Sequence, residues 1–138
     1  MKPENNLKLI DRMNHSTAFL QRHNMTITEA WEGHARVEMT IDESMLNVFH
    51  IVHGGILFSL ADTAAGTASF ATGRESVTLN ASINFIKPAT GKKITAIATE
   101  ISRGHTIGNY EVFLFNEDET IISRATLTMY FLKKKEEK

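Results

Sequence analysis

The chain has 138 residues, which is the length of one ordinary domain and enough to bury a core without disulfides or a structural metal. Apolar residues make up 42% and charged residues 22%, and the formal charge is -1, so no strong field favours nucleic acid or an anionic membrane as a partner. The absence of cysteine excludes disulfides, thiolate metal sites and cysteine nucleophiles. No apolar run is long enough to span a membrane and no signal peptide is evident, so we expect a cytoplasmic protein.

The N-terminal part is expected to hold a leader helix followed by a β-hairpin. Within residues 1–24, apolar residues recur at helical spacing, with a break expected near 14–16. Residues 26–31 and 34–41 follow as two strands, and the second alternates apolar with polar side chains. This alternation predicts a hairpin with one buried face.

The middle of the chain predicts a buried helix. From residue 55 to 71 the side chains are apolar or small almost all round, and Gly73 is a natural C-terminal stop. A strand is expected at 77–85, where Val77, Leu79, Ala81, Ile83 and Phe85 alternate with Thr78, Asn80, Ser82 and Asn84. Three further strands are expected at residues 94–101, 108–115 and 120–132.

This order of elements predicts an α+β fold in a single domain, residues 1–138. Short links between successive strands require antiparallel pairing. The simplest arrangement is an antiparallel sheet curled around the one long apolar helix. Residues 133–138 are expected to be a solvated tail.

Asp62 is the most informative single residue. It is the one charged residue between Ser44 and Gly73, on a helix expected to be buried. A buried carboxylate is costly unless something satisfies it, so an isolated one is a candidate for a functional site. The alternative is a structural role, with Asp62 bound to Ser59 or Thr63 or facing a polar cavity.

The turn His53-Gly54-Gly55 stands at the start of the same helix. The first N–H groups of a helix have no internal partners and, with the helix dipole, form an anion site. Glycines let a substrate carbonyl approach the backbone, as an oxyanion hole requires. The alternative is that paired glycines simply begin a tightly packed helix.

Several other polar residues are candidates for the functional site. Asn47 and His53 are expected to hold the glycine turn, while His50-x-x-His53 is a weak metal pattern without a third ligand. The polar side of the strand that contains Thr78 and Asn80 is either a solvent face or part of a pocket or subunit interface. Arg103 and His105 flank a turn, where they are candidates for phosphate binding.

The run from Asn47 through His53-Gly54-Gly55 to Asp62 closely resembles hotdog-fold acyl-CoA thioesterases of the phenylacetate-degradation and thioesterase-superfamily-member-2 type. Supporting similarity covers roughly residues 26 to 132, including the segment from Ile83 to Pro88. One departure is His50, where such proteins often have glycine. Its bulk is expected to reshape the loop or narrow the acyl pocket.

The resemblance implies a hotdog fold and a role for each matching residue. Gly54 would polarise the thioester carbonyl through its N–H and Asp62 would be the catalytic carboxylate, with Asn47 and His53 in support and Gly55 beside the substrate. In some members a strand hydroxyl from the partner subunit orients water, and that position falls on Thr78 or a neighbour. Coenzyme A would be part of the substrate, with no resident cofactor and no metal. The family works as dimers or tetramers with sites shared between subunits, and a monomer of this size would leave a strand edge open.

Two other readings remain open from the sequence. A hotdog dehydratase or hydratase would pair a histidine with the acid and act at carbon without releasing thiol. A non-catalytic acyl-CoA binding module would bind without turnover, since fold alone does not establish activity. The acyl group and the choice between nucleophile and general base for Asp62 are also left open.

Overall fold

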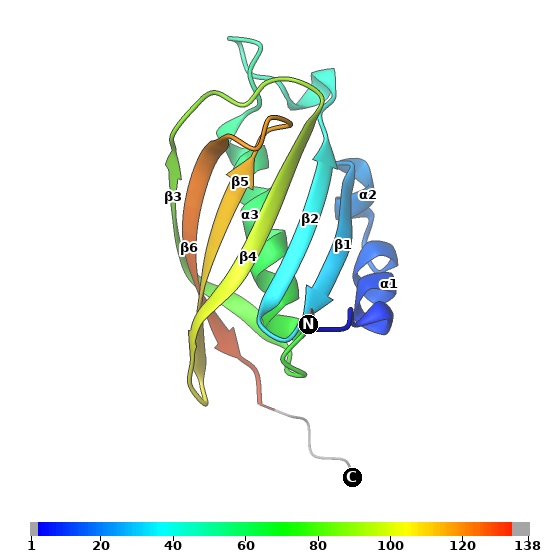
Figure 1. Cartoon of the computed structure of the whole chain (residues 1–138), viewed down its shortest axis with the longest axis vertical. Helices are drawn as coiled ribbons and strands as arrows, with labels where there is room; N and C mark the ends of the chain where they lie inside the picture. Colours follow the sequence, from blue (N-terminus) through cyan, green and yellow to red (C-terminus); the bar gives the residue numbers. More distant parts are fainter. Residues whose placement is uncertain (1–2, 134–138) are drawn as a thin grey trace.

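The computed structural model describes residues 3–133, so the expected tail beyond Lys133 lies outside the described residues. A curved antiparallel sheet of six strands wraps around one long helix (Figure 1), as expected from the sequence. The elements in chain order are α1 (Leu7–His15), α2 (Ala18–Arg22), β1 (Met25–Trp31), β2 (His34–Thr40), the 3-10 turn η1 (Glu43–Met45), α3 (Gly54–Phe70), β3 (Ser76–Phe85), β4 (Lys93–Arg103), β5 (Ile107–Phe115) and β6 (Ile121–Phe131).

The strand order is β1-β2-β4-β5-β6-β3, and every neighbouring pair is antiparallel. After β2 the chain runs through α3 along the concave side of the sheet and reaches β3 at the far margin. The segment after β3 then returns across the top of the sheet to β4, beside β2 (Figure 1). As a result, β1 and β3 are the two edges of the sheet.

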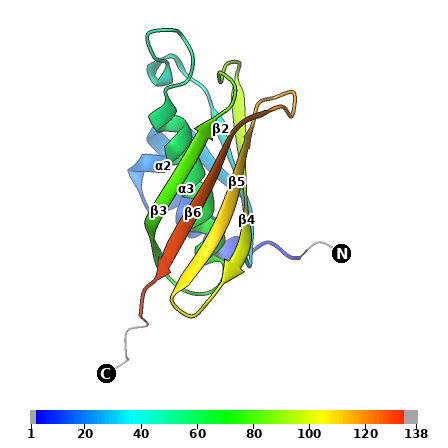
Figure 2. The same cartoon turned by 90° about the vertical axis from the view of Figure 1, so that its left-hand side faces the viewer.

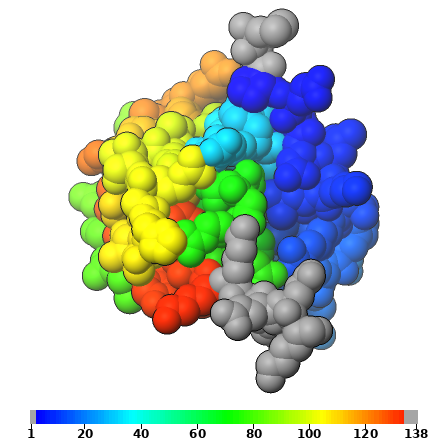
Figure 3. All heavy atoms as spheres, turned by 90° about the horizontal axis from the view of Figure 1, so that it is seen from below, coloured from blue at the N-terminus to red at the C-terminus, as the bar shows by residue number. Residues whose placement is uncertain are grey.

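The N-terminal leader, residues 3–24, lies along the β1 edge, and its expected break is confirmed. α1 ends at His15 and α2 begins at Ala18, so the leader is two short helices. Seen from below, the leader lies on one side of the C-terminal end of α3, and β4, β5 and β6 lie on the other (Figure 3).

The core lies between α3 and the concave face of the sheet, and α3 contacts all six strands. Small side chains on both layers bring the helix close to the strands: Ala61, Ala64, Ala65 and Ala68 on α3 meet a sheet face that includes Ala96 and Ala98. The larger inward side chains fill the space around them, and all are almost fully buried: Leu57, Leu60, Val37, Met39, Ile94, Tyr110, Val112, Leu114, Leu127 and Met129. Within residues 3–133, no helix is long and apolar enough to cross a lipid bilayer.

The expectation that α3 is buried on every side is wrong. Ser59, Asp62, Thr63, Gly66 and Phe70 are only partly buried, and their spacing places them on one face of the helix. The sheet curls around only part of the helix circumference, so this face is left partly open in a single chain. It is called the open face of α3 below.

The expected alternation along β3 is also interrupted, at a β-bulge. Thr78 pairs with Met129 and Asn80 pairs with Thr128, so Leu79 is an extra residue opposite β6. Directly paired residues project to the same side of a sheet, and Met129 is buried against the core. Thr78 therefore faces α3, whereas Asn80 projects from the outer face. The predicted polar face is kept by Asn80, Ser82 and Asn84, and Thr78 alone leaves it.

Candidate active site

The loop before α3 is organised by Asn47. Its Oδ1 accepts hydrogen bonds from the N–H groups of Phe49 (2.9 Å) and Ile51 (3.4 Å), and its backbone N–H donates to the Ile51 carbonyl (2.8 Å). His50 takes a left-handed conformation with φ of 60° inside this turn, and its side chain is exposed. Asn47 therefore fixes the approach of the chain to the helix start.

His53 is the N-cap of α3. Its Nδ1 accepts a hydrogen bond from the Gly55 N–H (2.9 Å), which satisfies one of the free donors of the first turn. The Gly54 N–H forms no hydrogen bond with the described residues. The arrangement therefore leaves the Gly54 N–H available to a ligand, with the positive end of the helix dipole behind it.

An apolar cavity of about 340 Å³ adjoins Gly54. Phe85, at the end of β3, lies over the glycine, since a Cβ at Gly54 would stand 3.1 Å from the Phe85 Cζ. Phe85 was not predicted as a site residue, although the alternation along residues 77–85 places it on the apolar side of the strand, at its end. The other side chains around the cavity are mostly apolar, including Ile51, Leu57, Ile86 and Pro88, whereas His50 does not line it.

Asp62 lies on the open face of α3 and is bound by Thr78. The Thr78 hydroxyl donates to Asp62 Oδ1 over 2.6 Å. The two neighbours considered as structural partners, Ser59 and Thr63, instead donate to the carbonyls of Gly55 and Ser59. One carboxylate oxygen is thus oriented by the strand, at a point where the bulge turned Thr78 inward.

A second cavity of about 210 Å³ begins at Asp62 and Thr78. It extends toward the C-terminal end of α3, where Gly66 and Phe70 border it, and under the leader. No histidine of the described residues lines it in the single chain.

The remaining predicted substrate-binding residues do not lie beside Asp62 and Thr78 in a single chain. Asn80 projects from the opposite face of the sheet. Arg103 lies at the end of β4, where it forms ion pairs with Glu32 and with Glu100 (3.2 Å to the latter), and the pairing with Glu32 raises the pKa of Arg103. His105 is exposed in the turn that follows. Phosphate binding by Arg103 and His105 stays a prediction.

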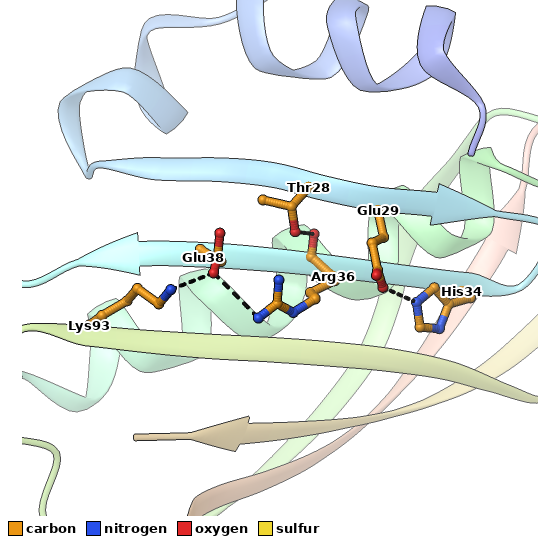
Figure 4. A network of polar contacts seen from close by, with 6 residues as sticks. All are labelled: Thr28, Glu29, His34, Arg36, Glu38 and Lys93. Carbon is orange, nitrogen blue, oxygen red and sulfur yellow. Dashed lines mark hydrogen bonds and ion pairs between the residues drawn. The ribbon is translucent and has the colours of Figure 1, made fainter. Parts of the chain in front are cut away.

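The outer face of the sheet carries a separate polar network (Figure 4). Glu38 on β2 lies between Lys93 of β4, at 2.6 Å, and Arg36, at 3.3 Å. The hydrogen bond from Lys93 lowers the pKa of Glu38. These charges are paired with one another on the side of the sheet away from Asp62, which is typical of a stabilising surface network. No cluster of three or more potential metal ligands occurs in residues 3–133.

The family model described as the thioesterase superfamily matches residues 49–123, which is more than half of the chain. A putative esterase of Archaeoglobus fulgidus is 37% identical over 105 residues, covering 75% of this chain and 68% of that protein. The acyl-coenzyme A thioesterase PaaI of Escherichia coli is 37% identical over 93 residues, covering 67% of this chain and 66% of PaaI.

Solved structures agree with these relatives. The structure of the E. coli PaaI protein from the phenylacetic acid degradation operon superposes with a TM-score of 0.88 at 28% identity, covering 92% of this chain and 93% of that one. A hypothetical thioesterase of Streptococcus pneumoniae solved with coenzyme A gives a TM-score of 0.82 at 26% identity, covering 92% and 99%. The chain belongs to the thioesterase superfamily and has its hotdog fold.

Proposed function

We propose that the protein hydrolyses an acyl- or aryl-coenzyme A thioester to the free acid and coenzyme A, with Asp62 as the catalytic carboxylate. The observation that carries this proposal is the 2.6 Å hydrogen bond from Thr78 to Asp62 on the open face of α3. A carboxylate that is oriented on one oxygen and accessible on the other is suited to attack or to proton abstraction.

The Gly54 N–H is the proposed oxyanion donor. The thioester carbonyl accepts from this N–H, and the helix dipole stabilises the negative charge that develops on the oxygen. His53 and Asn47 do not contact the substrate carbonyl in this scheme. They position Gly54 by capping the helix and by holding the loop, through the contacts described above.

The site requires two copies of the chain. Gly54 and Asp62 are eight residues apart on one helix, which is about 12 Å along its axis. One thioester carbonyl cannot contact both groups at that separation, so the Gly54 of one copy must face the Asp62 of another. The open β3 edge (Figure 2), with Leu79 59% exposed and Val77 50% exposed, supports pairing of two copies there.

The reaction has two routes that the geometry supports equally. In one, Asp62 takes a proton from water as the water oxygen attacks the carbonyl carbon, and the tetrahedral intermediate then expels the coenzyme A thiolate. In the other, Asp62 attacks the carbonyl carbon directly and the coenzyme A thiolate is expelled, which leaves a mixed anhydride. Water then hydrolyses the anhydride to the free acid and restores the carboxylate of Asp62. In both, Thr78 holds the carboxylate and Gly54 holds the oxyanion.

The relatives support the substrate class. One is named as an acyl-coenzyme A thioesterase, and a neighbouring thioesterase structure contains coenzyme A. Coenzyme A would enter as part of the substrate and leave as product, with no resident cofactor. The reaction fits the cytoplasmic location predicted from the sequence, and the oligomer beyond two copies, dimer or tetramer, is open to sedimentation analysis.

The first test is thiol release from a panel of acyl- and aryl-CoA esters, comparing the wild type with Asp62→Asn. The amide keeps the size of the side chain but is neither a base nor a nucleophile, so we expect a loss of about 10² or more in kcat. Near-normal hydrolysis by Asp62→Asn would exclude the assigned role. A wild type that releases no thiol from any ester would exclude the activity.

The oxyanion donor is tested by a matched pair at Gly54. Proline fits the first position of a helix, and the φ of -59° and ψ of 136° at His53 suit a residue before proline. Gly54→Pro removes the N–H, and we expect kcat to fall by about 10² to 10³. Gly54→Ala adds the same Cβ contact to Phe85 but keeps the N–H, so its loss is expected to be much smaller. Equal losses in both variants would show that crowding at Phe85, and not the N–H, matters.

The shared site is tested by mixing. Asp62→Asn and Gly54→Pro are each expected to be inactive alone, but a mixed dimer has one site with both groups intact. Random exchange of subunits would restore about a quarter of the wild-type activity, because half of the dimers are mixed and each has one working site. No recovery after demonstrated subunit exchange would mean that both groups act within one chain or that the assignment is wrong.

A further inference from the structure

Gly66 has no structural reason to be glycine within this chain. It lies in the interior of α3, where glycine is less favourable than alanine. Its φ is not positive, and a Cβ built on it would meet no heavy atom within 4 Å. Neither the backbone nor close packing in the single chain therefore accounts for the missing side chain.

The space that Gly66 leaves open is part of the cavity that begins at Asp62. Gly66 follows Asp62 by four residues, so both lie on the open face of α3, one turn apart. The cavity of about 210 Å³ passes over Gly66 and is bordered deeper in by Phe70, Met129, Met13 and Leu20. A group that reacts at Asp62 thus has an apolar space directly beyond it.

The cavity offers contact surface rather than hydrogen bonds. Asp62 is its one charged side chain among the described residues. Its hydroxyls already have partners within the chain: Thr78 binds Asp62, Thr63 binds the Ser59 carbonyl, and Ser76 binds Ser69 over 2.7 Å. Such a lining suits an unsubstituted alkyl chain or an aryl ring. A polar or charged acyl group would lose its hydration there and find no hydrogen-bond partner in return.

The leader forms the outer wall of this cavity through Met13 and Leu20. The residue after Met13 is Asn14, whose side chain binds both backbone groups of Ile27 on β1, accepting from the N–H over 2.8 Å and donating to the carbonyl over 3.1 Å. This pair of bonds ties the wall to the sheet. The two helices therefore form a fixed boundary beside the open face.

We propose that this cavity is the acyl pocket, that Gly66 sets its depth, and that Met13 closes its outer side. The inference rests on the proposed thioesterase activity and deepens it by naming apolar acyl or aryl groups as the class accepted. An acyl chain whose carbonyl is at Asp62 then lies across Gly66, and a side chain at residue 66 shortens the chain that fits.

The experiment compares kcat/KM across a homologous series of straight-chain acyl-CoA esters, from acetyl to decanoyl, together with phenylacetyl-CoA. Three variants are measured beside the wild type: Gly66→Ala, Gly66→Val and Met13→Ala. For Gly66→Val we expect the longest esters to lose about tenfold or more, since one methylene in an apolar pocket is worth about 10- to 200-fold. The shortest ester is expected to stay within a few-fold of wild type. Gly66→Ala should show the same trend more weakly.

Met13→Ala provides the opposite change. It enlarges the pocket from the leader side, so we expect the preferred chain to become longer, while Gly66→Val makes it shorter. A defect in folding cannot produce opposite shifts. Melting temperature is the control for the glycine site, because Gly66→Ala is expected to melt at a higher temperature than the wild type.

Three outcomes would overturn the inference. The first is an unchanged chain-length profile in an active Gly66→Val enzyme. This result rejects the cavity as the acyl pocket and leaves the proposed activity intact. The second is an equal loss for all esters, which means that residue 66 affects Asp62 itself. The third is loss of the oligomer in Gly66→Val, which means that a second copy of the chain fills this space. A wild type without thiol release would instead reject the proposed function, and this inference with it.

Discussion

The two edges of the sheet are treated in opposite ways. At the β1 edge, outward-facing backbone groups are paired with asparagine side chains and the backbone of the leader. Asn14 binds both groups of Ile27, while the N–H of Ala30 donates to Asn5 and its carbonyl accepts from the Asn6 N–H. The leader thereby takes the place of a seventh strand, and no second chain can pair there without displacing it.

The β3 edge has no such cover in residues 3–133. β3 is ten residues long, and apolar side chains such as Val77 and Leu79 are half exposed or more. A long edge with exposed apolar residues favours association with another chain. The leader therefore closes one edge of the sheet, while the other edge is open on the side where Thr78 orients the proposed catalytic carboxylate.

Between the two edges, the largest effect on oligomeric state and activity is expected from a charge on the open β3 edge. Leu79→Lys changes a side chain that is 59% exposed, so the isolated fold should tolerate it. If two copies pair along β3, the new charges repel across the two-fold axis, and the protein should become monomeric with a loss of about 10² in kcat. Sedimentation and thiol release measure the two quantities. A matched lysine at Thr26, on the closed edge, should change neither. An active Leu79→Lys monomer would show that pairing along the open β3 edge is not needed for activity.

The next effect is at the bulge of the same edge strand. Thr78→Val removes the hydroxyl that binds Asp62 and keeps the branched shape, so we expect kcat to fall about tenfold or more, as for loss of a group that positions the catalytic carboxylate. Thr78→Ser restores a hydroxyl and should recover most of the activity. A valine variant with normal kcat would remove Thr78 from the site.

A smaller effect, on stability, is expected at the closed edge. Asn14→Ala leaves the N–H and the carbonyl of Ile27 without their protein partners, and we expect a loss of about 1–3 kcal/mol in the free energy of unfolding. Asn14→Asp keeps an acceptor for the N–H and should lose less at neutral pH. Urea denaturation with a constant m-value measures the difference. An unchanged midpoint would mean that water replaces the asparagine at no cost.

The smallest effect on stability is expected at Glu38, on the outer face of β2, the strand next to the closed β1 edge. The folded-state pKa of Glu38 is lowered, chiefly by the hydrogen bond from Lys93, so its carboxylate form stabilises the fold. This contribution is fully present above the ordinary pKa near 4.5 and is lost as the pH falls through the lower folded-state value. Glu38→Gln should therefore cost less than about 1 kcal/mol at pH 7 and progressively less below pH 4.5. A difference that does not shrink in acid would assign the effect to packing.

Most of the fold could be predicted from the sequence because its signals are local. The two-residue turn at Glu32-Gly33, the apolar helix that ends before Gly73, and the alternation along β2 each depend on neighbouring residues alone. The helix start was also predicted, at His53-Gly54-Gly55, although the role of His53 as the N-cap was not. Those features predicted an antiparallel sheet around one helix and made Gly54 and Asp62 candidate site residues, while the hotdog fold and the joint role of the two residues were implied by the family resemblance.

Which side chains meet depends on the tertiary structure. A bulge is a property of two paired strands, so nothing in the alternation of Thr78 and Asn80 revealed that they lie on opposite faces. The open face of α3 depends on how far the sheet curls, and the closed β1 edge depends on asparagines that reach a strand thirteen or more residues away. Local sequence patterns were enough to define the helices and strands and the residues capable of chemistry. The curvature of the sheet and the register of its strands determined that Asp62 is reached by Thr78, and that an apolar space lies beyond it over Gly66.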